Sequence, residues 1–100
     1  MKICIVEGHV WATKKEPSLE GLKFMVVRDL EADGSKDDDV YVAADMVGAG
    51  VGERVLVVSG STARRAVGGD ERPVDAAIVG IIDVIEVDRE KAEKDKKKPK

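Results

Sequence analysis

Apolar residues in this chain gather in short segments that are rich in β-branched side chains. Valine occurs 16 times and isoleucine six times, against four leucines. β-Branched side chains fit the pleated surface of a strand better than a helix. The pattern therefore predicts five strands, over residues 2–13, 22–28, 40–43, 54–58 and 77–87.

Two of these strands carry further detail. Gly8 interrupts the first strand, which predicts a bulge or a bend at that residue. In the second strand Leu22, Phe24 and Val26 fall on one face, so we expect these side chains to point into the core. Residues 33–35, with the sequence Asp-Gly-Ser, predict the turn before the third strand.

One short helix is predicted between the fourth and fifth strands. Ser61 is expected to cap one or two helical turns that include residues 63–66, and Gly68 with Gly69 is expected to end them. Five short strands, one short helix and glycine bends predict an all-β fold, a small barrel that is closed or partly closed. The strands are not separated by long helices, which argues against a parallel βαβ sheet.

The fifth predicted strand is apolar on both faces over residues 77–82. A small barrel has a single interior, so a strand of this kind needs a second cover for its outer face. A domain of this size has little chain of its own to provide that cover. We therefore expect the outer face to pack on another subunit.

The length of 100 residues corresponds to one domain, and 43% hydrophobic with 37% charged residues is typical of a folded, soluble chain. We predict a barrel domain over residues 1–87 and a charged, lysine-rich, disordered tail over residues 88–100. The tail holds seven basic and four acidic residues, which leaves ten basic and 16 acidic residues for the domain. An acidic domain is a poor partner for phosphate backbones.

The sequence favours a cytoplasmic protein. Its longest apolar run, residues 76–82, is far below the ~20 residues that a membrane helix needs. The N-terminal segment has no apolar signal-peptide region, because Glu7 and Gly8 interrupt it. Cys4 is the single cysteine, which permits no internal disulfide and fits a reducing compartment.

No catalytic or metal-binding motif is recognisable. His9 is the only histidine, and Cys4 lies in an apolar strand, where it is expected to be a small buried hydrophobe. These two residues are too few for a zinc site. The acidic run 37–39 lacks calcium-binding spacing and is expected to be a solvated loop. The sequence therefore predicts neither an enzyme nor a metal site.

The glycine-rich stretches do not predict a cofactor site. Residues 48–52 read Gly-Ala-Gly-Val-Gly, and the next residue is Glu53, followed by a strand and not by a helix. Residues 59–62, Ser-Gly-Ser-Thr, lack the Gly-Lys-Thr ending of a phosphate loop. Both stretches are expected to form tight turns where backbones approach closely.

A single-stranded nucleic-acid module is the alternative that this barrel type leaves open. Such modules use aromatic side chains for base stacking together with a basic groove. The chain has three aromatic residues of this kind, Trp11, Phe24 and Tyr41, and Phe24 is expected to point inward. The pair Arg64 and Arg65 is not a groove, so the support for this alternative is weak.

Five stretches, read together, resemble one family: residues 1–10, 17–23, 45–53, 59–64 and 72–83. They hold a Gly-Ala-Gly loop, a Gly-Ser-x-Ala-Arg turn and a Pro-Val-Asp-Ala-Ala segment, in one order over residues 1–87. This combination resembles the bacterial microcompartment vertex proteins of the EutN/CcmL family. Trp11 departs from it, since smaller aliphatic residues are common there in the family.

The resemblance implies a five-stranded OB-like β-barrel that assembles into a cyclic pentamer. In the family, such pentamers close the five-fold vertices of a polyhedral protein shell whose facets are hexameric tiles. The implied function is structural, in a microcompartment shell in the cytoplasm, with no enzyme activity and no cofactor. The implied partners are identical copies of the chain and the hexameric and trimeric shell proteins, with no nucleic acid and no membrane.

A five-fold ring needs a heterologous interface, in which one patch meets a different patch on the neighbour. Small residues would allow the backbones of two subunits to approach closely. Arg64 would donate directional hydrogen bonds across the interface, and Asp75 would accept one. Residues 77–82 would supply apolar area for burial between the subunits. The predicted interface residues are Gly48, Ala49, Gly50, Ala63, Arg64, Asp75, Ile78 and Ile81. The predicted lining of an axial pore is Ser59, Gly60 and Ser61.

Overall fold

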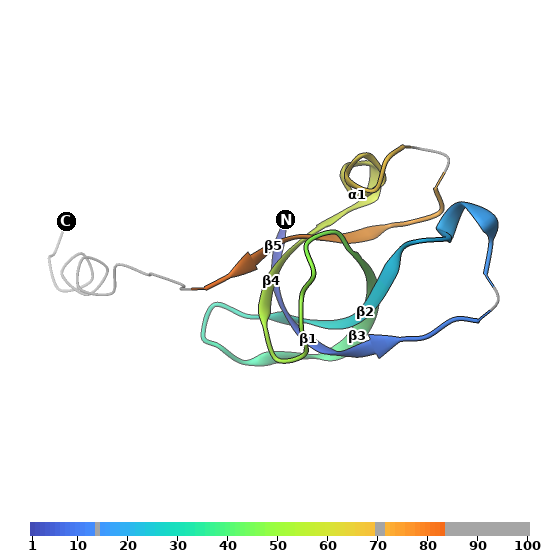
Figure 1. Cartoon of the computed structure of the whole chain (residues 1–100). Coiled ribbons are helices and arrows are strands. Elements are labelled where there is room, and N and C mark those ends of the chain that lie inside the picture. The colour runs from blue at the N-terminus through green and yellow to red at the C-terminus, as the bar shows by residue number, and fades with distance from the viewer. Residues whose placement is uncertain (14, 70–71, 84–100) are drawn as a thin grey trace, which may run out of the picture.

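The structure, a computed structural model, describes residues 1–13, 15–69 and 72–83. Its elements, in chain order, are β1 (Lys2–Val10), the 3₁₀ turn η1 (Pro17–Leu19), β2 (Lys23–Leu30), β3 (Lys36–Asp45), β4 (Arg54–Ser59), α1 (Gly60–Ala66) and β5 (Ala76–Ile82) (Figure 1). The end of the predicted fifth strand (84–87), the predicted domain boundary and the lysine-rich tail lie outside the described residues. Within the described residues, no helix is long and apolar enough to cross a membrane.

The five strands close into a barrel in the order β1-β2-β3-β5-β4, which confirms the predicted all-β barrel with one short helix. All neighbouring strands are antiparallel except β3 and β5, which pair in parallel through Ala44 with Ala77 and Asp45 with Ile78. The order β4-β1-β2-β3 is that of a Greek key, the arrangement of OB-type barrels. The pairing of β1 with β2 shifts register between Val6 and Gly8, which confirms the bulge predicted at Gly8.

Strand β3 is longer than predicted and includes the acidic run 37–39, so the expectation of a loop there was wrong. The 33–35 turn, which is confirmed, allows β2 and β3 to continue as a hairpin whose last pair joins Leu30 with Lys36. Arg28 also holds this segment, because its Nη1 donates to the carbonyl oxygens of Asp37 and Asp38 at 2.7 Å. Backbone pairing with β2 therefore outweighs the low strand propensity of aspartate.

The interior of the barrel is one apolar cluster to which β2 contributes Met25 and Val27, both without exposed surface. The inward orientation predicted for Leu22, Phe24 and Val26 was therefore wrong. Leu22 and Phe24 pack against a second apolar cluster, which lies on the outer side of the barrel and includes Ala63 of α1. Both faces of β2 carry apolar residues, so alternation alone does not tell which face is inside.

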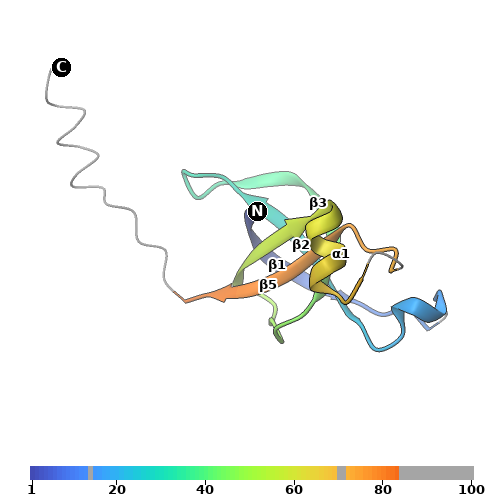
Figure 2. The ribbon, with the colours of Figure 1, turned by 90° about the horizontal axis from the view of Figure 1, so that it is seen from above.

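Helix α1 lies against β4 and β5 on the outside of the barrel (Figures 1 and 2). Its N-cap is Ser59, in extended conformation, so the prediction that Ser61 caps the helix was wrong. Ser61 lies within the first turn, because the helix begins directly after β4. The predicted glycine stop is confirmed: Gly68 has φ +115° and the N–H of Gly69 donates to the Arg64 carbonyl at 2.9 Å.

Helix α1 covers part of the outer face of β5. Ala76 and Ile78 belong to the interior cluster, while Ala77 and Val79 belong to the cluster beneath α1. Ala77 is completely buried within one chain, so the expectation that another subunit must cover the outer face of this strand was wrong at that position. Ile81 and Ile82, nearer the end of the strand, are half-buried.

Candidate subunit-contact surface

The loop between β3 and β4, residues 46–53, exposes apolar side chains beside its glycines. Met46 and Val47 are each 41% exposed and Val51 is 56% exposed. Gly48 adopts φ +77° and Gly52 φ +88°, a conformation that side chains other than glycine disfavour. Apolar side chains grouped on an exposed loop are typical of a contact surface.

The carboxylate of Asp45 holds the first half of this loop. Its Oδ1 accepts the N–H of Val47 at 3.1 Å and of Gly48 at 3.0 Å, and its Oδ2 accepts the N–H of Ala49 at 2.9 Å. The Nζ of Lys23 lies 3.9 Å from Oδ2. Asp45 is the buried charged residue of the described part of the chain. Hydrogen bonds from three backbone N–H groups therefore compensate for the burial of this carboxylate.

The second half of the loop is tied to its surroundings by backbone bonds. The N–H of Gly52 donates to the Val6 carbonyl at 2.8 Å, and the N–H of Val6 donates to the Glu53 carbonyl at 3.0 Å. The N–H of Gly50 donates to Oε1 of Glu53 at 2.6 Å, and a Cβ on Gly50 would lie 3.1 Å from that oxygen. The loop is therefore anchored on both sides, with Ala49 buried in the interior cluster.

A second group of predicted residues meets where β4 passes into α1 and β5 begins. Ser59 pairs with Ala76, and the N–H of Gly60 donates to the carbonyl of Asp75 at 3.0 Å. The side chains of Ser59, Ser61 and Asp75 are exposed. The structure thus brings Asp75 together with the three predicted pore residues. All four belong to other segments of the chain than the 46–53 loop.

The remaining predicted interface residues differ in exposure. Ala49, Ala63 and Ile78 have at most 1% of their surface exposed and pack within their own chain. Arg64 and Ile81 are half-buried. Met46, Val47 and Val51 were not among the predicted interface residues, although the sequence shows them as the apolar residues of a glycine-rich loop.

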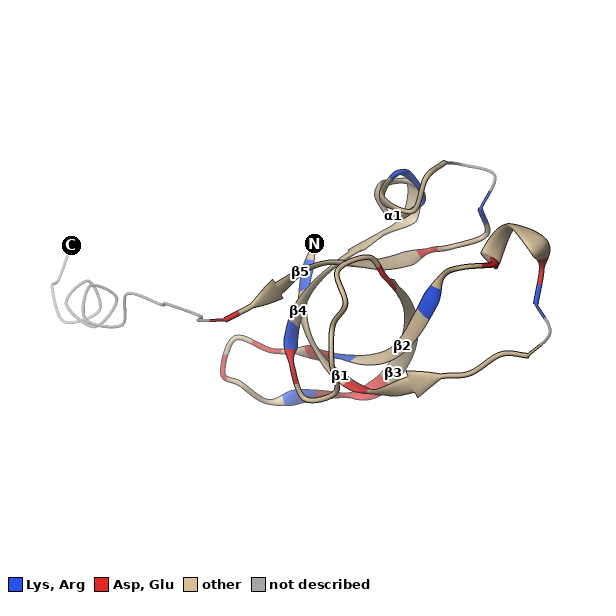
Figure 3. Cartoon of the chain, in the orientation of Figure 1, with Lys and Arg blue, Asp and Glu red and all other residues tan. Residues whose placement is uncertain are grey.

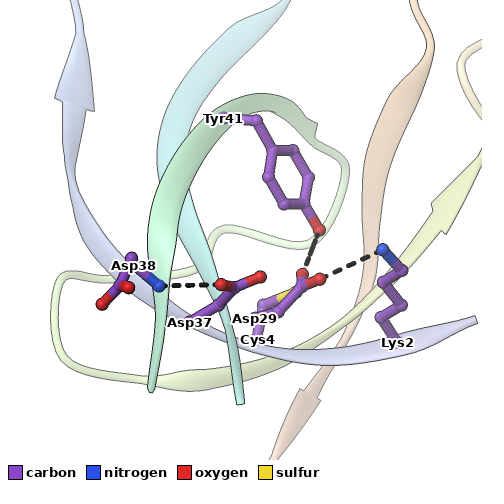
Figure 4. A network of polar contacts seen from close by, with 6 residues as sticks. All are labelled: Lys2, Cys4, Asp29, Asp37, Asp38 and Tyr41. Carbon is purple, nitrogen blue, oxygen red and sulfur yellow. Dashed lines mark hydrogen bonds and ion pairs between the residues drawn. The ribbon is translucent and has the colours of Figure 1, made fainter. Parts of the chain in front are cut away.

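A polar network lies where β1, β2 and β3 adjoin (Figure 4). Oδ1 of Asp29 accepts the hydroxyl of Tyr41 at 2.7 Å, and the thiol of Cys4 lies 3.2 Å from both that oxygen and the Tyr41 hydroxyl. The Nζ of Lys2 donates to Oδ2 of Asp29 at 3.0 Å. Cys4 is therefore buried, as predicted, but in a polar network and not only among apolar side chains.

Burial and these bonds shift the pKa values of the network. Desolvation, together with the bond to Asp29, raises the pKa of the Cys4 thiol to about 11. Desolvation and the bonds to Cys4 and Asp29 also raise the pKa of Tyr41. Desolvation alone would raise the pKa of Asp29, but the hydrogen bonds from Tyr41, Cys4 and Lys2 lower it below its ordinary value. The network therefore keeps the thiol and phenol protonated and the carboxylate ionised at neutral pH.

The Cys4 thiol is expected to be inert in the folded protein. At pH 8 a thiol with a pKa of about 11 is ionised in about one molecule in a thousand, and its sulfur has no exposed surface. A chromogenic disulfide reagent should react with the folded protein about a hundredfold or more slowly than with the protein in denaturant. Equal rates would contradict this placement of Cys4.

Asp29 is expected to make the fold less stable as the pH becomes acidic. Because its pKa is lower in the folded chain, its ionised form stabilises the fold above the ordinary aspartate pKa, about 3.9. This contribution is lost as the pH falls through the lower folded value. In urea unfolding at a series of pH values, Asp29→Asn should flatten the acid loss of stability, whereas Asp39→Asn on the exposed part of β3 should not. Equal pH profiles for all three proteins would contradict this.

His9 lies on β1, five residues from Cys4 and outside the polar network. His9 stacks on Trp11 with ring centroids 5.9 Å apart, beside an open hollow of about 310 Å³ that Lys15 and Phe24 also line. Within residues 1–13, 15–69 and 72–83, no group of three or more His, Cys, Asp or Glu side chains is placed to hold a metal ion.

Comparisons with known proteins agree with this geometry. Residues 1–83 match the family model described as "Ethanolamine utilisation protein EutN/carboxysome". The carboxysome shell vertex protein CcmL of Synechococcus elongatus is 52% identical over 88 residues, which cover 88% of this chain and 89% of the relative. The solved CcmL of Gloeobacter violaceus superimposes with a TM-score of 0.82 at 45% identity, covering 88% of this chain and 91% of its own.

A second solved structure adds the assembly state of a relative. GrpN of Rhodospirillum rubrum, described as a pentameric microcompartment shell protein, has a TM-score of 0.79 and 41% identity, covering 87% of this chain and 99% of its own. Identities of this size over most of both chains show common descent as well as a common fold. The chain belongs to the EutN/CcmL family.

Proposed function

We propose that this chain assembles into a cyclic homopentamer that occupies the five-fold vertices of a bacterial microcompartment shell in the cytoplasm. The observation that carries the proposal is the 52% identity, over 88% of the chain, to a carboxysome shell vertex protein. The pentameric GrpN, alike in fold over nearly all of its own length, supports the ring. The role is structural, with no catalytic step.

The interface of the ring joins two different patches, as closure of a cyclic assembly requires. One patch is the 46–53 loop, where Gly48 and Gly50 let the backbone of a neighbour approach. The other includes Arg64 in the last turn of α1, Asp75 directly before β5 and Ile81 on β5. Ser59, Gly60 and Ser61 line the axial opening. Hexameric and trimeric shell proteins surround the pentamer in the shell.

The alternative of a single-stranded nucleic-acid module has less support. Phe24 packs against the outer apolar cluster and Tyr41 is bonded in the polar network, so Trp11 is the aromatic residue of these three that is most exposed for stacking. Basic and acidic residues also alternate around the barrel without forming a continuous basic stretch on the described strands (Figure 3). Base stacking along a strand needs a series of such platforms in a basic groove.

Co-assembly with hexameric shell proteins tests the vertex role. A sheet of six-fold tiles closes into a polyhedron only where five-fold units are inserted. Hexameric shell proteins of the same host, purified alone and then mixed with this protein, should change from open sheets or tubes to closed particles in electron micrographs. Unchanged open assemblies, with the added protein left free, would contradict the proposal.

A further inference from the structure

We infer that Asp45 is a positioning residue for subunit contact. Its buried carboxylate holds the first half of the 46–53 loop in one conformation. Met46, Val47 and Val51 of this loop thereby present a preorganised apolar surface to a second copy of this chain. The inference rests on the proposed pentamer and goes beyond it, because it names the side chains of the 46–53 loop that make the contact and the buried group that shapes the loop.

An aspartate can hold a turn without being buried, so the burial of Asp45 needs a further reason. Asp33 makes a similar turn in the β2–β3 hairpin, where its Oδ1 accepts the N–H of Ser35 at 2.9 Å while the side chain stays exposed. Removing a carboxylate from water is unfavourable unless hydrogen bonds replace the lost hydration. At Asp45 three backbone N–H groups do so, and all three belong to the loop that carries the exposed apolar residues.

Backbone hydrogen bonds and core packing fix the rest of the loop. The N–H of Met46 donates to the carbonyl of Ile78 at 3.2 Å, and the N–H of Gly52 donates to the carbonyl of Val6. Ala49 anchors the middle of the loop in the interior cluster. A backbone held at its start, middle and end presents its outward side chains in one arrangement. Preorganisation of this kind reduces the ordering entropy that binding would otherwise cost.

The character of the surface favours a second copy of the chain as its occupant. The outward side chains are two valines and a methionine, with 41–56% of their surface still exposed, and apolar area of this kind dominates the core of subunit interfaces. A relative with the same fold, GrpN, is a pentamer, so identical copies of the chain are the partners that a family member is known to bind. A neighbouring hexameric shell protein is the competing occupant, and the experiment below separates the two.

The experiment compares Asp45→Asn and Asp45→Ala with Asp33→Asn as the matched control. Asparagine keeps one acceptor oxygen and loses the bond to the Ala49 N–H, whereas alanine loses all three bonds. Sedimentation velocity over a concentration series should show half-assembly at about tenfold higher protein concentration for Asp45→Asn and about a hundredfold or more for Asp45→Ala. Asp33→Asn should assemble like the wild type. Hydrogen exchange should show faster exchange at Val47, Gly48 and Ala49 in the Asp45 variants, with unchanged far-UV circular dichroism.

A second variant tests the surface without touching the buried carboxylate, in case the Asp45 variants do not fold. Met46→Ser with Val51→Ser changes exposed side chains alone and should also weaken ring assembly by about tenfold or more. Wild-type ring affinity in this double variant would overturn the inference, and would assign the surface to a hexameric partner if closed shells were then lost. Wild-type affinity in a folded Asp45→Asn variant with rapidly exchanging loop amides would also overturn it. A wild-type protein that forms no ring would instead contradict the proposed function itself.

Discussion

Replacing Val27 with aspartate is expected to unfold the protein. Val27 has no exposed surface and belongs to the interior cluster of the barrel. A carboxylate there would have no ionic partner, and an uncompensated buried charge destabilises a protein by about 3–5 kcal/mol. The lost burial of the valine side chain adds about 1.5–3 kcal/mol, and a small domain lies toward the low end of the usual total stability of about 5–15 kcal/mol, so the change removes most or all of it. Far-UV circular dichroism and urea unfolding at neutral pH measure the loss.

Val42→Asp is the matched control for this change. Val42 lies opposite Val26 on the outer face of the neighbouring strand and is 45% exposed. The same substitution there leaves the charge in water and should change the free energy of unfolding by about 0.5 kcal/mol or less. Equal losses of stability at residues 27 and 42 would contradict the assignment of Met25 and Val27 to the interior.

Ala63→Asp is expected to detach α1 from the barrel and to reduce stability by about 3–5 kcal/mol. Ala63 is the completely buried residue of α1 and packs in the outer apolar cluster, to which the half-buried Ala66 also contributes. Val58 and Ala77 belong to the same cluster and would lose part of their cover together. Urea unfolding of the variant, followed by circular dichroism, measures the loss.

The neighbouring substitution Thr62→Asp provides the control for the helix. Thr62 is exposed and lies in the first turn of α1, where a negative charge interacts favourably with the helix dipole. It should leave stability unchanged or slightly raised. Equal losses of stability at both positions would contradict the assignment of Ala63 to the buried face of α1.

The strand pattern was sufficient to predict the barrel, because valine-rich segments separated by glycine and aspartate turns have few other solutions. It did not predict which face of β2 points inward, since Phe24 and Met25 are both apolar and differ only in what covers them. Phe24 packs against the outer apolar cluster, which assembles from residues far apart in the sequence, among them Ala63 of α1. The same cluster buries Ala77, which removed the need for another subunit at that position.

The candidate site was predicted in part. The glycine loop at 48–52 was identified, because Gly-Ala-Gly is visible in the sequence, but Asp45 was not, since a single aspartate before a loop does not reveal whether it is buried. Three backbone N–H groups converge on its carboxylate only after β3 and the loop are placed in space. Ala63 and Ile78 were expected at the interface on account of size and hydrophobicity, properties that they share with residues of a barrel's own core.

The mass of the native protein tests the central claim most directly. One chain has a mass of 10.8 kDa, so a ring of five has a mass of about 54 kDa. Native mass spectrometry of the purified 100-residue chain at micromolar concentration should show the five-chain species as the dominant one. A protein that remains at the mass of one chain, or that forms dimers, tetramers or hexamers in place of pentamers, would contradict the account.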